Sequence, residues 1–222
     1  IKENKMTTLN NLKKSDVLNA AIVVSKELSA SAKAMEIKFN ERFSAGMDTK
    51  KDKADLRAAQ TKSAYFDNNI LEAMRDEKQC GVFYFSIKIA KKEPELFFRE
   101  TLANSYALEK LAYLMASMAS GKCVFNSALS TNSRVFAMIE IIKKDPTTFS
   151  NGDVFKIMNK AKQENEMKPD ATYTQANQLI KLFRDLGIVE AIKDGGKSEF
   201  GMAKFKFIKN DLFNHIATSF SK

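Results

Sequence analysis

The chain has 222 residues, a formal net charge of +9 and 44% hydrophobic side chains. That hydrophobic content is enough for a buried core and excludes a fully disordered chain. The positive charge favours an anionic partner, either a nucleic acid or an acidic membrane surface. Because the basic residues are spread along the whole chain, a basic surface has to be formed by folding.

The two cysteines, Cys80 and Cys123, are too few for a disulfide framework. They favour free thiols in a reducing compartment, and a single bridge between them stays open. The sequence has no run of 18 apolar residues, so no transmembrane helix and no membrane partner is expected. No signal peptide is expected either, and Met6 is a candidate natural start. A cytoplasmic protein is therefore predicted.

Two long amphipathic helices are expected in the N-terminal part. Ser15 and Asp16 are typical of a helix start, and apolar residues then recur at steps of three and four until Gly46. A second apolar series follows a short charged loop, which predicts an antiparallel pair of helices at about 16–45 and 54–77. Their length favours a homodimer interface along these helices.

The middle of the chain contains one ambiguous segment, 82–90 within CGVFYFSIKIAKKEP. Its β-branched and aromatic residues favour a strand, whereas the surrounding helices favour a buried helix; the strand is the interpretation adopted here. From Pro94 to Gly121 the pattern predicts one central, buried helix. A boundary near 131 would then separate a helical N-terminal domain, 1–131, from a second domain, 132–222.

The C-terminal part alternates helix and strand patterns in a definite order. A helix at 132–145 is followed by a short strand, PTTFS, and by a helix that starts at Ser150 with Asp153 in a capping arrangement. The next helix, 172–186, starts with a Thr172–Gln175 capping box. Two strands, IVEAIK and MAKFKFIK, then flank the glycine-containing loop DGGKSEFG.

This order, and above all the stretch LIKLFRDLGIVEAIKDGGKSEFGMAKFKF, resembles the winged helix-turn-helix superfamily over roughly 132–210. The fold class expected is therefore mainly α, a helical N-terminal domain followed by a winged-helix domain with a small β-hairpin. The resemblance implies binding of double-stranded DNA, with the 172–186 helix in the major groove and the 193–206 wing on the backbone or in the minor groove.

The candidate DNA-binding residues are polar side chains of that helix and lysines of the wing. The apolar stripe of the helix is expected to turn these side chains outward, where Asn and Gln can bond adenine and Arg and Lys can bond guanine or phosphate. The wing lysines would make binding salt-dependent. The candidates are Thr172, Tyr173, Thr174, Gln175, Asn177, Gln178, Lys181 and Arg184 on the helix, and Lys193, Lys197, Lys204 and Lys206 on the wing.

An enzyme is not expected, and neither a cofactor nor a metal site is predicted. His215 is the lone histidine, and no phosphate-binding or dinucleotide-binding glycine motif is present. The predicted function is DNA binding in transcription control or replication initiation. The alternative is a structural, adaptor or viral assembly protein whose winged helix binds a protein partner, an interpretation favoured by the composition rich in Lys and Asn.

Overall fold

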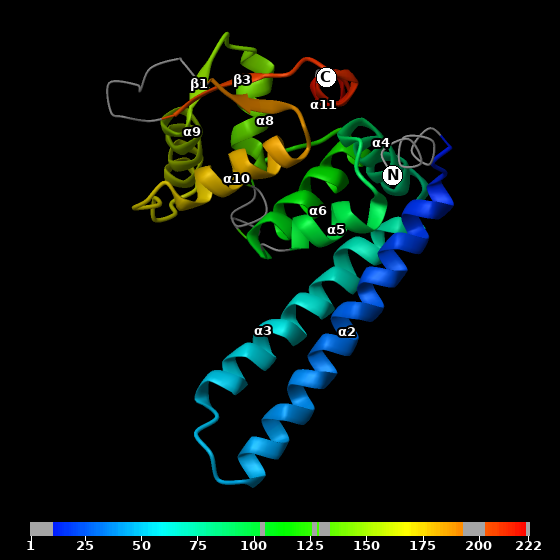
Figure 1. Cartoon of the computed structure of the whole chain (residues 1–222). Helices are drawn as coiled ribbons and strands as arrows, with labels where there is room; N and C mark the ends of the chain where they lie inside the picture. The colour runs from blue at the N-terminus through cyan, green and yellow to red at the C-terminus, as the bar shows by residue number, and fades with distance from the viewer. Residues whose placement is uncertain (1–10, 103–104, 126–127, 129–133, 193–202, 221–222) are drawn as a thin grey trace.

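The structure is a computed structural model that describes residues 11–102, 105–125, 128, 134–192 and 203–220. Two antiparallel helices, α2 (Lys14–Ser44) and α3 (Lys50–Phe66), form an arm that projects from the rest of the protein (Figure 1). The base of α2 packs against α4 and α5 through Val17, Ala21 and Val24, which are almost completely buried. The predicted pair of antiparallel helices is confirmed.

The polypeptide leaves the arm through two short helical segments, η1 (Asp67–Leu71) and η2 (Ala73–Arg75), and enters α4 (Glu77–Ala90). The strand predicted at 82–90 is therefore wrong. Cys80, Phe83 and Ile87 are buried at helical spacing, and the carboxylate of Asp76 accepts a 2.9 Å hydrogen bond from the Gln79 amide at the helix start. Burial against helices on one face decides the conformation here over the strand preference of the individual residues.

Two helices, α5 (Pro94–Leu102) and α6 (Ser105–Ser120), occupy the region predicted as one helix. Helix α6 lies at the centre, as expected, and packs against α4, α5, α8 and α10. Its side chains Leu108, Leu111, Leu114 and Met115 are buried. In the described part of the chain, no helix combines the length and the hydropathy needed to cross a bilayer.

The described residues of the C-terminal part form four further helices and a small antiparallel sheet of strand order β1-β3-β2. The sheet register places Phe149 opposite Phe205, and Val189 opposite Phe207. The mainly helical class with a small sheet is thus confirmed. The elements are α8 (Val135–Lys144), β1 (Phe149–Ser150), α9 (Asn151–Glu164), α10 (Thr174–Asp185), β2 (Val189–Ala191), β3 (Lys204–Phe207) and α11 (Asp211–Ser219).

Several local features predicted in this part are present in the structure. Ser150 and Asp153 form the predicted capping box at the start of α9. On β3 the buried Phe205 alternates with the exposed Lys206, which matches the period of a strand. The predicted wing loop, with Lys193 and Lys197, lies in 193–202, outside the described residues, as does Met6.

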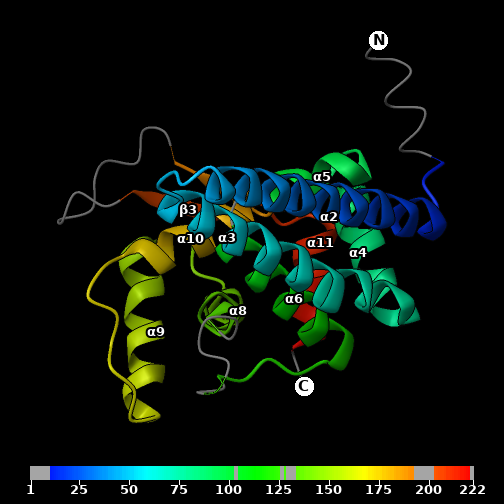
Figure 2. The ribbon, with the colours of Figure 1, turned by 90° about the horizontal axis from the view of Figure 1, so that it is seen from below.

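The two halves of the chain share one continuous hydrophobic core. Helix α11 contacts α4 from the N-terminal half as well as α8, and the ring of His215 lies 5.1 Å from the ring of Phe85. Seen from below, the outer end of the arm passes in front of α10 and β3, whereas α8 and α9 are seen clear of it (Figure 2). Cys80 and Cys123 are buried free thiols, so the bridge between them is not formed.

Candidate nucleic-acid interface

Helix α10 has one buried face and one exposed face. Ala176, Leu179, Ile180 and Phe183 are buried, as the sequence predicted. The exposed face carries Thr174, Asn177, Lys181 and Arg184, spaced three, four and three residues apart. These four side chains therefore lie along a single stripe of the helix, here called the α10 stripe.

Two of the predicted contact residues, Gln175 and Gln178, are half-buried beside this stripe. Gln175 is half-buried, and its side-chain oxygen accepts a 3.1 Å hydrogen bond from the ammonium of Lys110 on α6. The expectation that Gln175 faces outward is wrong, because α6 packs beside α10 on that side. Gln178 is also half-buried.

The predicted Thr172–Gln175 capping box is not formed. Helix α10 begins at Thr174, and Tyr173 is the N-cap residue without a capping side-chain bond. The hydroxyls of Thr172 and Thr174 lie 3.1 Å apart, and the Tyr173 ring packs 4.5 Å from the ring of Phe155. Thr172 and Tyr173 remain exposed next to the start of the α10 stripe.

The cations of this face are only partly neutralised. Lys181 pairs with Asp185 at 2.8 Å, and Lys206 pairs across the strands with Glu190 at 2.9 Å. Exposed pairs of this kind contribute little, about 0–1 kcal/mol, so a phosphate can compete with the carboxylate. Arg184 and Lys204 form no ion pair with any residue that the structure describes.

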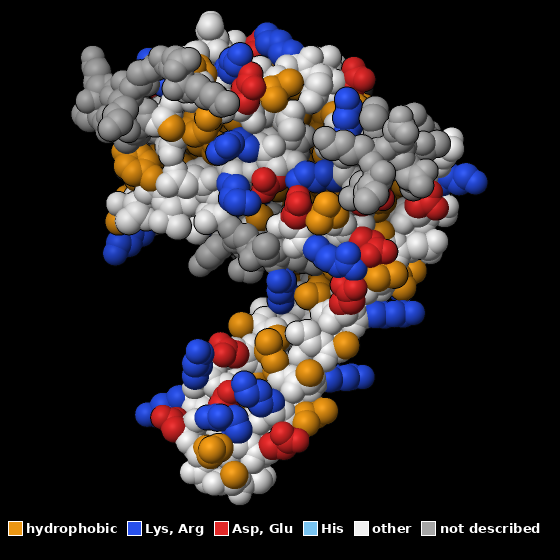
Figure 3. Space-filling model, in the orientation of Figure 1, with side chains coloured by type: hydrophobic (Ala, Val, Ile, Leu, Met, Phe, Trp, Pro, Cys, Tyr) orange, Lys and Arg blue, Asp and Glu red, His pale blue; other side chains and the backbone are white. Residues whose placement is uncertain are grey.

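Figure 3 shows the outer surface over α10 and β3, where Lys and Arg side chains lie next to Asp and Glu side chains. One polar group of the stripe is already engaged, since the Asn177 side-chain oxygen accepts a hydrogen bond from the Asn151 amide. The surface is therefore moderately basic. It is not a continuous field of one sign.

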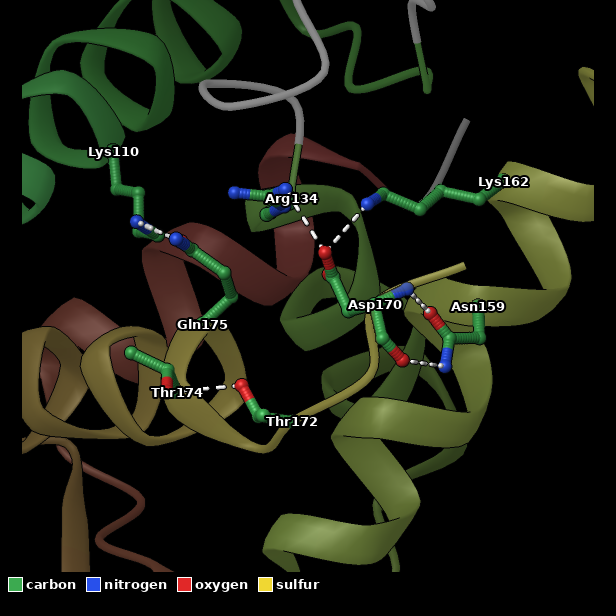
Figure 4. A network of polar contacts seen from close by, with 8 residues as sticks. All are labelled: Lys110, Arg134, Asn159, Lys162, Asp170, Thr172, Thr174 and Gln175. Carbon is green, nitrogen blue, oxygen red and sulfur yellow. Dashed lines mark hydrogen bonds and ion pairs between the residues drawn. The ribbon is translucent and has the colours of Figure 1, made fainter. Parts of the chain in front are cut away.

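Behind α10 lies a buried polar cluster that the sequence did not reveal (Figure 4). The Asp170 carboxylate accepts hydrogen bonds from Lys162 at 2.6 Å and from Arg134 at 3.3 Å, and both of these cations are buried. Asn159 fixes the Asp170 backbone, accepting from its amide at 2.8 Å and donating to its carbonyl at 3.2 Å. The turn between α9 and α10 is thereby held in one conformation.

Lys110 adds a third buried cation to this region. Burial, together with the nearby Arg134, lowers the pKa of Lys110 to about 8, although Glu109 and Asp170 act in the opposite direction. Burial also raises the pKa of Glu109. Because α6, the residue before α8, α9 and the turn before α10 all contribute to it, the cluster helps to fix the position of α10 relative to the N-terminal half.

Within the described ranges, no three His, Cys, Asp or Glu side chains gather into a possible metal site. The comparisons with known proteins do not assign the chain to a family: no protein-family model, no curated protein and no solved structure matches it.

Proposed function

We propose that the protein binds double-stranded DNA through its C-terminal part, with the α10 stripe in the major groove and the β2–β3 pair against the backbone. The observation that carries the proposal is the contact of α10 with β2, which pairs with β3, the strand that holds Lys204 and Lys206. The order α8, β1, α9, α10, β2, β3 is the one expected of a winged helix. A helix of about 18 Å, the length of α10, fits the major groove.

The exposed side chains suit the two kinds of contact that a DNA-binding helix makes. Asn177 carries an amide that can bond the N6 and N7 atoms of adenine once it releases Asn151. Arg184 can bond guanine or a phosphate. Lys204 and Lys206 would neutralise phosphates, a contribution that is independent of sequence and decreases with salt. Gln175 has no part in this contact set.

The test is fluorescence anisotropy of a labelled mixed-sequence duplex, repeated over a series of salt concentrations. The double variant Lys204→Glu with Lys206→Glu should weaken binding and reduce the slope of log affinity against log salt by about 1.8, the value for two lost phosphate contacts. The matched control is Lys78→Glu with Lys88→Glu, two exposed lysines of α4. If the control reduces affinity and slope as much as the test variant, the proposed interface is wrong.

A protein-binding role is the second candidate function, and the arm favours it. Phe43 and Met47 at its tip are 66% and 53% exposed, and large apolar side chains that protrude in this way mark interaction surfaces. The duplex experiment separates the two roles, because a pure adaptor would show no salt-dependent binding to the duplex at all.

A further inference from the structure

The outer half of the arm is unusual in having almost no core of its own. Helix α2 has 31 residues and is therefore about 46 Å long. Between residues 25 and 60 only Ala32 and Leu56 are buried hydrophobic side chains. Figure 1 shows this half of the arm projecting away from all other elements. Because helices in water depend on packing of an apolar face, two helices that share so few buried apolar side chains are weakly supported alone.

The apolar stripe of α2 nevertheless continues along this unsupported part. Met35 is 39% exposed and Phe43 is 66% exposed, and the Phe43 ring stacks on Phe39 with the centroids 5.9 Å apart. The opposing part of α3 carries small or charged residues that do not cover the stripe. Figure 3 shows hydrophobic side chains at intervals along the arm, among charged ones of both signs.

A groove of about 780 Å³ runs between the two helices of the arm and ends at the start of α6. Leu28 and Met35 of α2 form one side, and Ala54 and Ala58 of α3 form part of the other. Alanine side chains permit a neighbouring helix to approach closely, at an axis separation of about 8–10 Å. The groove is apolar along Leu28, Met35, Ala54 and Ala58 but is also lined by Asp55, Arg57, Lys62 and Glu109, which suits an amphipathic helix.

We propose that the occupant of this groove is the arm of a second copy of the chain, so that two arms form a four-helix bundle. A symmetric contact requires projecting and receiving groups on the same patch, since each copy supplies both. The arm meets this requirement: Met35 lines the groove and is 39% exposed, and the small side chains of Ala54 and Ala58 leave room for it.

The charges of the arm also fit a second copy. The ionised side chains of its outer half are of both signs, whereas a polyanionic partner would favour one sign. Arg42 and Lys38 already approach Asp52 across the hairpin, at 2.8 and 3.8 Å. The same alternation on two arms allows pairing between copies. The charged residues of this half are Lys26, Glu27, Lys33, Glu36, Lys38, Glu41, Arg42, Asp48, Lys50, Lys51, Asp52, Lys53, Asp55 and Arg57.

The size of the contact sets its strength. An overlap of 20 residues per helix is about 30 Å long, and two helices side by side are about 20 Å wide. Each copy would contribute about 600 Å², and the total of about 1,200 Å² lies at the lower end of specific interfaces. A dimer that dissociates in the micromolar range is therefore expected. The dimer proposal does not depend on DNA binding, and the two are tested by separate experiments.

Analytical ultracentrifugation of the full chain from 1 to 100 µM tests the proposal. The chain has a mass of 25.0 kDa, and the sedimenting species should approach twice that mass as the concentration rises. Met35→Glu places a carboxylate in the apolar groove and should weaken the dimer at least tenfold. Ile37→Glu is the matched control: Ile37 is 59% exposed and lies about 200° around α2 from Met35, away from the groove.

Circular dichroism of each variant verifies that the monomer is folded, which is expected because both positions are exposed. A wild-type chain that stays at 25.0 kDa up to 100 µM overturns the proposal and leaves the groove for a different partner. A dimer that Met35→Glu and Ile37→Glu weaken equally, or not at all, also overturns it, because the contact would then lie elsewhere.

Discussion

The ammonium of Lys110 donates a 3.1 Å hydrogen bond to the side-chain oxygen of Gln175, and this bond joins α6 to α10. The side chain of Lys110 has no exposed surface, and its pKa is about 8. A buried lysine with a neutral hydrogen-bond partner is costly to keep charged. The contact between the two halves of the chain therefore depends on a group that titrates close to neutral pH.

This titration predicts a pH-dependent stability. The folded pKa of Lys110 lies below the usual 10.5, so between pH 8 and 10.5 the folded state binds fewer protons than the unfolded state. The free energy of unfolding should then rise with pH in this interval, by up to about 3 kcal/mol. Urea denaturation at pH 7, 8, 9 and 10 measures the rise.

The control for this prediction is the variant Lys110→Met, which should lack the rise. Cys123 acts in the opposite direction, because burial raises its pKa to about 12 and the folded thiol resists ionisation above pH 9. It is present in both proteins, so its effect cancels in the difference between them. Parallel curves for wild type and variant would contradict the assignment to Lys110.

Asp170 is predicted to be the most sensitive carboxylate of the C-terminal part. Asp170→Asn removes the counter-charge of Lys162 and Arg134, both buried, and should lower the free energy of unfolding by about 3 kcal/mol. Asp185→Asn is the control, because Asp185 pairs with Lys181 on the surface and should cost less than about 1 kcal/mol. Urea denaturation at pH 7 compares them, and equal losses would exclude a special role for the buried cluster.

The two faces of α10 should respond differently to substitution. Arg184→Ala should weaken duplex binding by about 1–3 kcal/mol with little change in stability. Gln175→Ala should leave binding to DNA unchanged but lower the stability, because the buried Lys110 loses its hydrogen bond to this side chain. Anisotropy and thermal melting on the same samples check both. If Gln175→Ala weakened DNA binding without changing the stability, Gln175 would have to be counted among the residues that contact DNA.

Thiol reactivity is predicted to be suppressed in the folded protein. With its pKa raised to about 12 by burial, Cys123 should react with iodoacetamide about a thousandfold more slowly at pH 8 than it does in urea. Burial raises the pKa of Cys80 as well, with Lys14 opposing. Peptide mapping by mass spectrometry follows each site. Fast labelling of Cys123 in the native protein would show that its surroundings open readily.

Much of the fold could be predicted because the apolar spacing was regular. The stripe Ala176, Leu179, Ile180 and Phe183 located the buried face of α10, and Ser150 marked the start of α9. The segment 82–90 could not be assigned from its residues, since their strand preference was overridden by packing between α2 and α6. The end of α5 at Leu102 and the start of α6 at Ser105 are marked by no glycine or proline in the sequence.

The site was predicted less well than the fold, for a definite reason. The spacing of apolar residues predicts which face of a helix is polar. It does not predict whether another helix packs against that polar face. Gln175 was therefore expected in solvent, although α6 covers it. A signal for the buried cluster was present in Lys162, which lies four residues after the buried Met158 on the apolar face of α9.

Helix α11 has a practical consequence for anyone who divides this protein. After the last strand the polypeptide returns to α4, so that Leu212, Phe213 and Ile216 are buried close to the N-terminal half. A cut at residue 131 would separate Phe85 and Lys110, in the N-terminal fragment, from their partners His215 and Gln175 in the C-terminal fragment. Expression of either half alone should therefore give aggregated material. An affinity tag placed after α11 should be separated from it by a spacer, so that the packing of α11 is not disturbed.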